Sequence, residues 1–469
     1  MKSSSHYRAA LEKRMDRSST TSRLRKQEFL ASKRRLIPSQ EPSPFLLQQA
    51  TNVILSVKTS PLQSIAKPLK DLRDLLGTGD ESIIEQTVKA GLITKLFQIL
   101  DTGSPSIQMT SAWCLTNIAS GPTIYAKELL RFVPSLHGLL LSSSLSLVEQ
   151  IIWCFANLAG DSLEFQEVLR HHDIAQAVVD VTPTQCKTDH VISGELSDFR
   201  KVVLWCLTNL LRGTPPNDVS PFIDMLPCSI LSLKDSNNII EGAWLLSYIT
   251  ARGSDDVYNR IIQDSNVAII LEVLGQHLIS KPAVSLPLLR VIGNICAGPD
   301  PYVLKFFQGR TDLIVEMLIT VLEQSADDMC KSEACYALAN ISGTPELATI
   351  LLKPQLFVVL TNLVSSASFD VKREALALCA NLTFSDSRFV LDNLPLSLIC
   401  PLIQRSRDQR LLSIVLGMFS GLLAREAEAV VKMVECGCLP ILIELGESED
   451  CHQAAQASLL VDKYFENYL

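Results

Sequence analysis

The stretch IIWCFANLAGD (151–161) decides how this chain of 469 residues folds. Apolar side chains fill most of it, a tryptophan (Trp153) stands four residues before an asparagine (Asn157), and a turn containing glycine follows. Residues four apart lie on the same face of an α-helix. The stretch therefore predicts a buried helix that carries an indole and an amide side by side and then ends.

This pattern returns along the chain, which makes the body a repeat. The related stretches are SAWCLTNIASG (111–121), VLWCLTNLLRG (203–213), GAWLLSYITAR (242–252), LLRVIGNICAG (288–298), ACYALANISGT (334–344) and ALALCANLTFS (375–385). The asparagine-like positions follow one another at intervals of 40, 52, 39, 46, 46 and 41, and they are Asn117, Asn157, Asn209, Tyr248, Asn294, Asn340 and Asn381. Intervals of about 40–47 residues are typical of armadillo and HEAT repeats.

Helical units with one apolar face bury it by stacking on their neighbours, which creates an extended concave surface. We therefore expect an all-α fold, an armadillo-repeat right-handed superhelical solenoid of about ten repeats. Its expected parts are a basic arm (1–36), a linker and lead-in (37–64) and the armadillo-repeat domain (65–469). The interval of 52 is explained by the polar, turn-rich stretch VTPTQCKTDHVISGELS (181–197), which predicts a loop.

Charge is divided unevenly between the arm and the body. Residues 1–35 contain 11 basic and three acidic side chains, a net charge of +8, whereas the remainder carries −16. A basic arm on an acidic body suggests that the arm binds either an acidic surface of another protein or the body itself. Binding to nucleic acid is disfavoured because the acidic body would oppose it.

Composition excludes several other classes of protein. Apolar residues make up 47% and the mean hydropathy is +0.22, which excludes a mainly disordered chain. Apolar stretches are broken well short of 18 residues, and the basic N-terminus has no apolar core behind it, so neither a transmembrane helix nor a secretory signal is expected. The 13 cysteines form no C-x-x-C pair, which indicates buried free thiols in a reducing compartment.

The repeated indole and amide predict a groove for a peptide. Helices pack about 8–10 Å apart and an extended peptide advances about 3.3 Å per residue, so one repeat matches about three ligand residues. An asparagine can both donate to and accept from a peptide backbone, and indoles can hold the stems and charges of lysine or arginine. A single W-x-x-x-N is more often core and helix cap. Three in consecutive units favour binding, with Asp161 selecting a lysine.

These stretches resemble the importin alpha family of nuclear import adapters over nearly the whole chain. The strongest pieces are SAWCLTNIASG, EQIIWCFANLAGD (149–161), LWCLTNLLRG (204–213), LLRVIGNICAG and the terminal ASLLVDKYF (457–465). The resemblance implies that nuclear localisation signals bind in the groove. The implied major site comprises Trp113, Asn117, Gly121, Glu149, Trp153, Asn157, Asp161, Trp205, Asn209 and Glu241.

The resemblance extends to a second, minor binding site, although several of its positions differ from the family pattern. The implied minor site comprises Arg290, Asn294, Asp300, Glu333, Tyr336, Asn340, Glu374 and Asn381, and its two tryptophan positions hold Tyr336 and Ala377. We expect this site to be weaker, because alanine cannot stack on a cation. A family threonine falls at Ala126, and Arg252 stands where the family tends to be acidic.

The segment SRLRKQEFLASKRRLI (22–37) resembles the importin-beta-binding segment of the family, without its dense arginine run. The residues implied in binding importin beta, and in folding back onto the groove, are Arg23, Arg25, Lys26, Lys33, Arg34 and Arg35. The partners implied are therefore signal-bearing cargo, importin beta and an exportin, with the chain shuttling between cytoplasm and nucleus and contacting neither nucleic acid nor membrane.

The sequence also offers alternatives to a transport adapter. GDSLEF (160–165) is like a hydrolase signature, but Ser162 follows a repeat helix, so no enzyme and no cofactor is expected. His171-His172 and Cys436-x-Cys438 lack a second ligand pair at metal-binding spacing, so no metal is expected. An armadillo scaffold that binds acidic partners is disfavoured, because it would need a basic groove and the body carries a net charge of −16. A paralogue that binds basic peptides without transport stays open.

Overall fold

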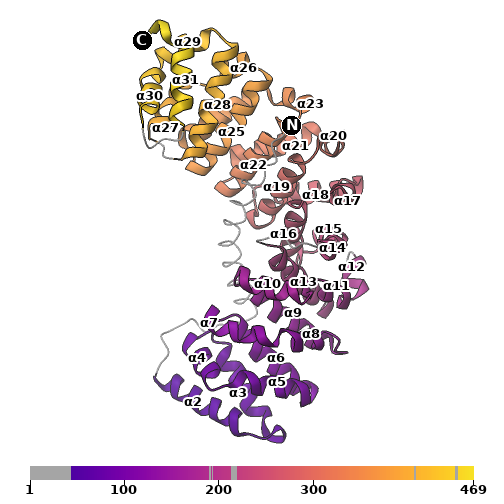
Figure 1. The fold of residues 1–469 in the computed structure, drawn as a ribbon. Coiled ribbons are helices and arrows are strands. Elements are labelled where there is room, and N and C mark those ends of the chain that lie inside the picture. Colours follow the sequence, from indigo (N-terminus) through magenta and orange to yellow (C-terminus); the bar gives the residue numbers. More distant parts are fainter. Residues whose placement is uncertain are drawn as a thin grey trace. The chain divides into compact units, whose positions relative to one another are not determined.

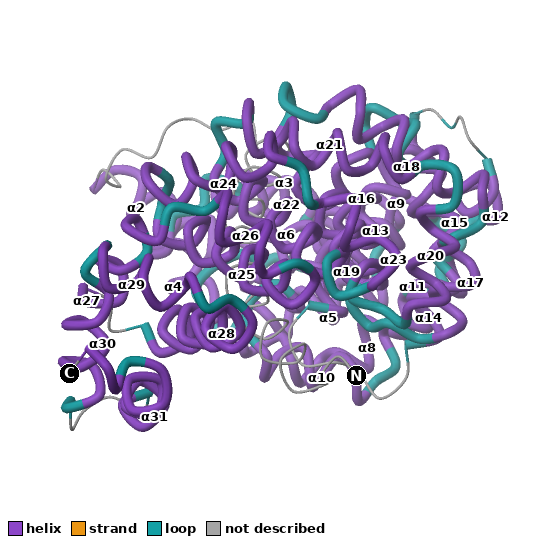
Figure 2. The backbone as a smooth tube through the Cα atoms, turned by 90° about the horizontal axis from the view of Figure 1, so that it is seen from above, coloured by secondary structure: helices purple, strands orange, loops and turns teal. Residues whose placement is uncertain are grey.

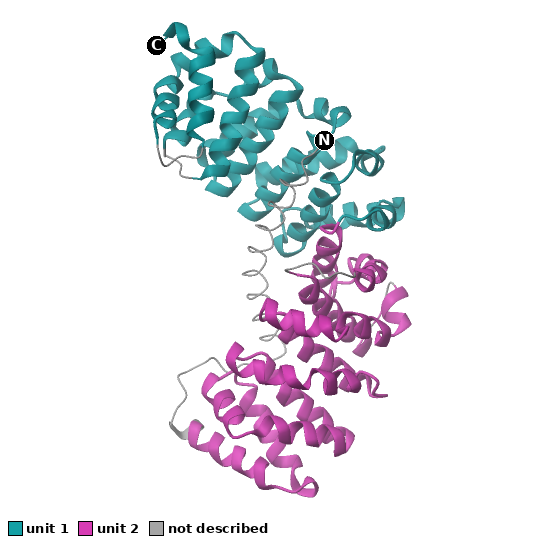
Figure 3. Cartoon of the chain, in the orientation of Figure 1, with its two compact units in different colours: residues 1–2, 253–469 teal, residues 3–252 magenta. Residues whose placement is uncertain are grey.

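The computed structural model of the chain describes residues 44–189, 192, 194–212, 219–405, 408–448 and 453–468. The basic arm lies outside these residues, with all six of its implied binding residues. The described residues form helices joined by short loops, and no strand occurs among them (Figure 2). They divide into two compact units, an N-terminal unit that ends at Arg252 and a C-terminal unit that begins at Gly253 (Figure 3).

The N-terminal unit consists of a helix pair followed by triplets of helices (Figure 1). The pair is α2 (Pro44–Thr59) and α3 (Ala66–Leu76). The triplets are α4 (Glu81–Lys89), α5 (Leu92–Thr102) and α6 (Pro105–Ala119); α7 (Thr123–Ala126), α8 (Val133–Leu139) and α9 (Leu145–Ala159); α10 (Leu163–His171), α11 (Ile174–Val181) and α13 (Glu195–Leu211); and α14 (Ser220–Asp224), α15 (Leu226–Ser232) and α16 (Ile239–Thr250). Helix α3 and the third helices α6, α9, α13 and α16 pack against one another in this order.

The C-terminal unit repeats this plan. Its triplets are α17 (Asp255–Ile261), α18 (Asp264–His277) and α19 (Pro282–Cys296); α20 (Asp300–Phe307), α21 (Thr311–Gln324) and α22 (Asp328–Ile341); α23 (Pro345–Ala348), α24 (Pro354–Ser366) and α25 (Phe369–Ser385); α26 (Ser387–Asn393), α27 (Cys400–Arg405) and α28 (Gln409–Arg425); and α29 (Glu428–Glu435), α30 (Cys438–Gly446) and α31 (Ala454–Tyr464). Short 3-10 helices occur at η1 (Leu62–Ser64), η2 (Lys127–Phe132), η3 (Thr349–Leu351), η4 (Leu396–Leu398) and η5 (Glu466–Tyr468). The third helices α19, α22, α25, α28 and α31 again pack consecutively. The all-helical repeat architecture is confirmed.

Burial explains why the third helices carry the most apolar sequences. Residues 150–159 of α9 are all buried, including Gln150 and Asn157. A third helix packs on third helices both before and after it, as well as on helices of its own triplet. A helix that is covered on nearly all sides must be apolar almost all round. The stretch that decides the fold is therefore the core of the repeat.

The expected linker contains a helix. Residues 44–59 form α2, which packs on α3, α4 and α5. Ala50, Ile54 and Val57 are buried at helical spacing, and Pro44 stands at the first helical position, where proline is tolerated. The described array thus begins about 20 residues before the expected boundary at residue 65.

The expected loop 181–197 also contains a helix, α12 (Thr184–Thr188). Arg200 of α13 is fully buried and donates to three backbone carbonyls at the end of α12, from Nε to Cys186 O (2.9 Å) and from Nη2 to Gln185 O (3.4 Å) and Asp189 O (2.6 Å). The last carbonyls of a helix have no partner within it, so a guanidinium can cap them. The sequence of the insertion does not reveal a cap that comes from outside it.

The described cysteines agree with the sequence interpretation except at one place. Nine are buried free thiols, and burial raises the pKa of Cys154 and of Cys379 to about 12. Cys400 and Cys438, however, form a disulfide with a Cα–Cα distance of 5.3 Å. They lie 38 residues apart on α27 and α30, which stacking brings into contact, so the expectation of free thiols alone was wrong for this pair.

Within the described residues no single helix combines the length and apolar character needed to cross a membrane. One sharply bent pair, Pro345–Leu351 with Pro354–Ser366, meets that criterion only when both helices are taken together.

Candidate peptide-binding site

The candidate site is built on the third helices of the N-terminal unit. On α9, Glu149, Trp153 and Asn157 follow at intervals of four residues, and Asp161 stands four residues further, just past the end of the helix. Side chains at this spacing form one stripe along a helix face. The packed neighbours α6 and α13 carry the matching pairs, Trp113 with Asn117 and Trp205 with Asn209.

The asparagines tie consecutive third helices together in a fixed register. Asn157 Nδ2 donates to Thr116 O (3.1 Å), and Asn209 Nδ2 donates to Ala156 O (3.0 Å). In both cases the acceptor is the residue immediately before the asparagine of the preceding repeat. The C-terminal unit repeats this pattern, with Asn340 donating to Gly293 O (3.0 Å) and Asn381 to Ala339 O (2.8 Å), and Asn117 donates to Arg73 O at 3.4 Å. The amides are therefore aligned within each unit.

This register also changes what the amides can offer a ligand. One N–H of Asn157 is engaged within the fold, whereas its Oδ1 atom is buried and accepts no hydrogen bond from a described residue. An unsatisfied buried acceptor costs about 1–3 kcal/mol. The Oδ1 atom of Asn157 is therefore a buried acceptor that no described donor satisfies.

The three indoles differ in exposure. The exposed fraction is 36% for Trp113 and only 7% for Trp153 and 2% for Trp205. The guanidinium carbon of Arg73, on α3, lies 4.9 Å from the centroid of the Trp113 ring. This distance is within the range of a cation–π contact. One indole of the row thus already holds a cation from the chain itself, whereas Trp153 and Trp205 are almost fully covered.

Asp161 supplies negative charge at the end of the α9 stripe. It is half-buried, accepts a hydrogen bond from Thr123 Oγ1 (2.8 Å), and forms no ion pair with any described residue. The carbonyls at the C-terminus of α9 add partial negative charge. The guanidinium of Arg212, which donates to Gly160 O (3.1 Å), offsets part of this negative charge.

The turn after α6 is shaped by Gly121. A Cβ atom at this position would lie 2.7 Å from Ile84 Cδ1, which is closer than carbon atoms can approach without displacement. A side chain at this position would therefore have to displace the end of Ile84, so glycine lets the turn pack closely on α4. The remaining acids of the implied major site are Glu149, which is half-buried, and Glu241, which is buried in the first turn of α16.

The GDSLEF stretch has a structural role at the start of a helix. Ser162 is the N-cap of α10, and its Oγ accepts a hydrogen bond from the backbone N–H of Phe165 (3.3 Å). Its neighbour Asp161 is held by Thr123. A capping serine that follows a helix is not the strand-to-helix nucleophile that the hydrolase signature requires.

Arginines occupy the turns of the next two repeats. Arg212 Nη2 donates to Gly160 O (3.1 Å), and Arg252 Nη2 donates to Leu211 O (2.6 Å). Each guanidinium therefore caps the end of the third helix before it, α9 or α13. At Ala126, where the family has a threonine, the side chain is fully buried.

In the C-terminal unit, two acids of the implied minor site, Glu333 and Glu374, pair with the chain's own arginines. Glu333 Oε1 pairs with Arg290 at 2.9 Å, with both side chains largely buried. Glu374 lies 3.4 Å from Arg373 and 3.6 Å from Arg410. A lysine ligand would meet little net negative charge at these positions.

The other residues of the implied minor site differ in burial and in side-chain type. Tyr336 is only 8% exposed and packs so closely on Gly293 that a Cβ atom there would lie 3.0 Å from its ring. Ala377 is half-buried at the other tryptophan position. Asp300, in contrast, is exposed and accepts a hydrogen bond from Thr344 Oγ1 (2.9 Å), and Asn294 is buried.

The sequence did not reveal the partners that orient or neutralise these groups. They are Arg73 at Trp113, Thr123 at Asp161, Thr344 at Asp300 and Arg410 at Glu374. Each pairing joins different repeats, so it depends on how the helices stack. No local spacing signals it.

Triplets of helices whose third members stack in register define an armadillo-repeat protein. The armadillo/beta-catenin-like repeat model matches residues 80–120, which are α4 to α6 with the residues that flank them. A crystal structure of an engineered protein matches with a TM-score of 0.72 and 22% identity, over 88% of this chain and 98% of that chain, and this likeness shows the fold.

Among curated proteins, the chain is similar to importin alpha subunits. It is 28% identical to importin subunit alpha-9 of Arabidopsis thaliana over 352 residues, 71% of this chain and 65% of that protein. It is 31% identical to importin subunit alpha-2 of Oryza sativa subsp. japonica over 326 residues, 67% of this chain and 59% of that protein. The chain is therefore a distant homologue of the importin alpha subunits, and the match spans less than two thirds of their length.

Proposed function

We propose that this protein is a nuclear import adapter. Its N-terminal unit binds lysine- and arginine-rich localisation signals along α6, α9 and α13, and residues 1–36 link the bound cargo to importin beta. The homology to importin alpha subunits supports this assignment. Recycling by an exportin and shuttling between cytoplasm and nucleus belong to the same proposal.

The observation that carries the proposal is the arrangement around Asn157. A carboxylate without an ionic partner among the described residues, Asp161, stands at the end of a stripe that holds an unsatisfied amide oxygen and an indole. A lysine in an extended peptide presents an ammonium for the carboxylate, a stem for the indole and a backbone N–H for the amide.

The implied major and minor sites differ in available negative charge. We therefore propose that basic peptides bind mainly at the major site, in the N-terminal unit. Asp161 keeps its charge available, whereas Glu333 and Glu374 already pair with arginines. A ligand lysine at the minor site would have to compete with a guanidinium that is fixed in place. Cargo with a single basic cluster should therefore bind at the major site.

Deletion of residues 1–36 tightens the binding of a lysine-rich signal peptide in the absence of importin beta. The arm carries the same basic chemistry as the cargo and is tethered to the groove, so it competes at high effective concentration. We expect a gain of about tenfold or more in fluorescence anisotropy, since tethering typically gives millimolar effective concentrations. Adding importin beta to the full chain should give the same gain, and equal affinities with and without the arm would contradict autoinhibition.

A protein that binds basic peptides without transporting them is the second candidate. The arginine pairs of Glu333 and Glu374 at the implied minor site, and the absence of a dense arginine run in residues 1–36, favour it. The affinity of importin beta for residues 1–36 separates the two candidates. Binding of importin beta that is displaced by an excess of the 1–36 peptide supports the adapter, whereas peptide binding without it supports the alternative.

A further inference from the structure

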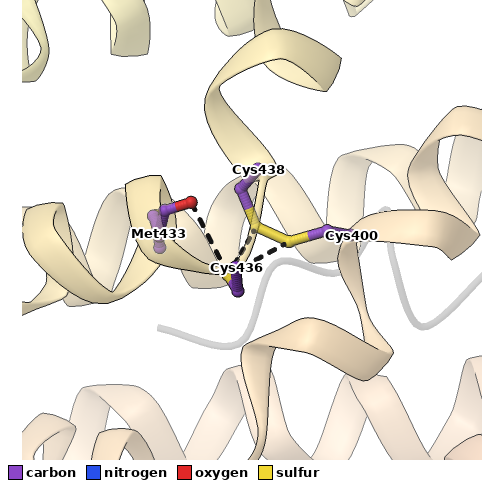
Figure 4. The surroundings of a disulfide bond; sticks show 4 residues. All are labelled: Cys400, Met433, Cys436 and Cys438. Carbon is purple, nitrogen blue, oxygen red and sulfur yellow. Dashed lines mark hydrogen bonds between the residues drawn. A yellow bond between two sulfur atoms is a disulfide. The ribbon is translucent and has the colours of Figure 1, made fainter. Parts of the chain in front are cut away.

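Three sulfur atoms meet where α27, α29 and α30 come together in the C-terminal unit (Figure 4). Cys400 begins α27, Cys436 follows the last residue of α29, and Cys438 begins α30. The three Sγ atoms lie within 4.8 Å of one another. Cys436 Sγ is 3.8 Å from Cys400 Sγ and 3.5 Å from Cys438 Sγ. We name these residues the three-cysteine cluster.

The stacking of two repeats brings a third sulfur, from Cys400, next to Cys436 and Cys438. Cys436-x-Cys438 alone offers two thiols and no second pair at metal-binding spacing. Cys400 comes from the preceding repeat, because α27 and α30 are second helices of consecutive triplets and pack on each other. The cluster therefore reaches three sulfur ligands only in the folded array.

The turn that carries Cys436 and Cys438 also occurs in an earlier repeat, but there it carries no cysteine. Gly437 is in the left-handed region with φ 76°, and so is Gly91 at the equivalent turn before α5. The residues that flank Gly91 are Ala90 and Leu92. Core packing at this turn thus needs no sulfur, which leaves the convergence of three cysteines without a packing explanation.

The dimensions of the cluster suit a tetrahedral thiolate site. Zinc binds sulfur at about 2.3 Å, which places two ligating sulfurs about 3.8 Å apart in a tetrahedron. Both distances from Cys436 are close to this value. Cys400 and Cys438 are buried and Cys436 is half-buried, so the open side of the cluster is the side of Cys436. Cys438 is also the first residue of a nine-residue helix, whose dipole favours a thiolate.

We propose that the three-cysteine cluster, in its reduced form, binds one zinc ion through the sulfurs of Cys400, Cys436 and Cys438, with a water molecule as the fourth ligand. Binding begins with reduction of the Cys400–Cys438 disulfide by a dithiol, which transfers two electrons and two protons and becomes a disulfide itself. The three thiols then release three protons as they bind the ion. The site is independent of the peptide groove and of the proposed function.

The test uses the full chain, reduced with a phosphine that is then removed, and titrated with Co²⁺ as the spectroscopic probe. We expect one equivalent of Co²⁺ to bind with thiolate-to-metal charge-transfer absorption, and one equivalent of Zn²⁺ to displace it. Cys400→Ser and Cys436→Ser should each weaken binding at least a hundredfold. The matched control is Cys330→Ser, a buried thiol on α22 that lies 3.7 Å from Ser285 Oγ, and it should leave binding unchanged.

A second measurement does not depend on any variant folding. Alkylation of Cys436 in the wild-type chain, followed by peptide mass spectrometry, should slow at least tenfold when one equivalent of Zn²⁺ is present. Absence of the Co²⁺ absorption band, or an unchanged alkylation rate, would overturn the proposal. The same holds if the cluster variants bind Co²⁺ as the wild-type chain does, because the metal would then be bound elsewhere.

Discussion

Asp161→Lys lowers the affinity of the chain for a lysine-rich signal peptide by about a hundredfold or more. Reversing one charge of a close ion pair typically costs about 2–5 kcal/mol, and each 1.4 kcal/mol is a factor of ten. The carboxylate is half-buried and accepts a hydrogen bond from Thr123. A lysine at position 161 would therefore bring a positive charge to the place where the lysine of the peptide is proposed to bind. The measurement is peptide anisotropy in the chain that lacks residues 1–36, where the arm cannot compete.

Two further variants make this result specific. Trp153→Ala should weaken binding by about tenfold or more, since a cation–π contact with a buried lysine stem contributes up to about 2 kcal/mol. Asp180→Lys is the matched control, because it makes the same charge change at an exposed position on α11 that pairs only with Gln176 among the interactions described. We expect it to change the affinity by less than about threefold, since surface charges are screened. An affinity that is unchanged in Asp161→Lys would remove the assignment of the major site.

Arg200→Met lowers the free energy of unfolding of the third triplet by about 3–5 kcal/mol. The substitution keeps most of the side-chain volume but leaves the carbonyls of Gln185, Cys186 and Asp189 without their donor in a buried environment. Because repeat arrays can open locally, the check is hydrogen exchange of the segment 182–204, together with urea unfolding.

The control for Arg200→Met is Arg260→Met. Arg260 forms an exposed ion pair with Asp256 four residues earlier on α17. Such pairs contribute about 0.3–0.5 kcal/mol, so this variant should leave the exchange pattern nearly unchanged. Equal protection of the segment 182–204 in Arg200→Met and the wild-type chain would show that the guanidinium does not hold α12.

The sequence allowed the repeat and the stripe on α9 to be predicted, because both depend on helical spacing within one stretch. The burial of α9 and the alignment of Asn117, Asn157 and Asn209 agree with that spacing. The donation of Asn157 to Thr116 O could not be predicted, since it depends on the vertical register of two helices. The same reason applies to Arg73 on Trp113.

The bounds of individual helices, and contacts between repeats, could not all be predicted from the sequence either. Helix α2 was assigned to a linker because three prolines dominate residues 36–50, although Ala50, Ile54 and Val57 already show helical spacing. Helix α12 is capped by Arg200, which lies outside the insertion. Cys400 was not associated with Cys436 and Cys438, because a separation of 36 or 38 residues is the repeat length and not a metal-ligand spacing.

The central claim is that an extended cationic peptide lies along the third helices, with a lysine between Asn157 and Asp161. Photo-crosslinking tests it most directly, with a lysine-rich signal peptide that carries a diazirine beside its central lysine and with mass spectrometry to locate the adducts. The account predicts adducts within residues 113–121, 149–161 and 205–211 on α6, α9 and α13. Adducts confined to the second helices α5, α8 and α11, or spread evenly over the chain, would contradict it.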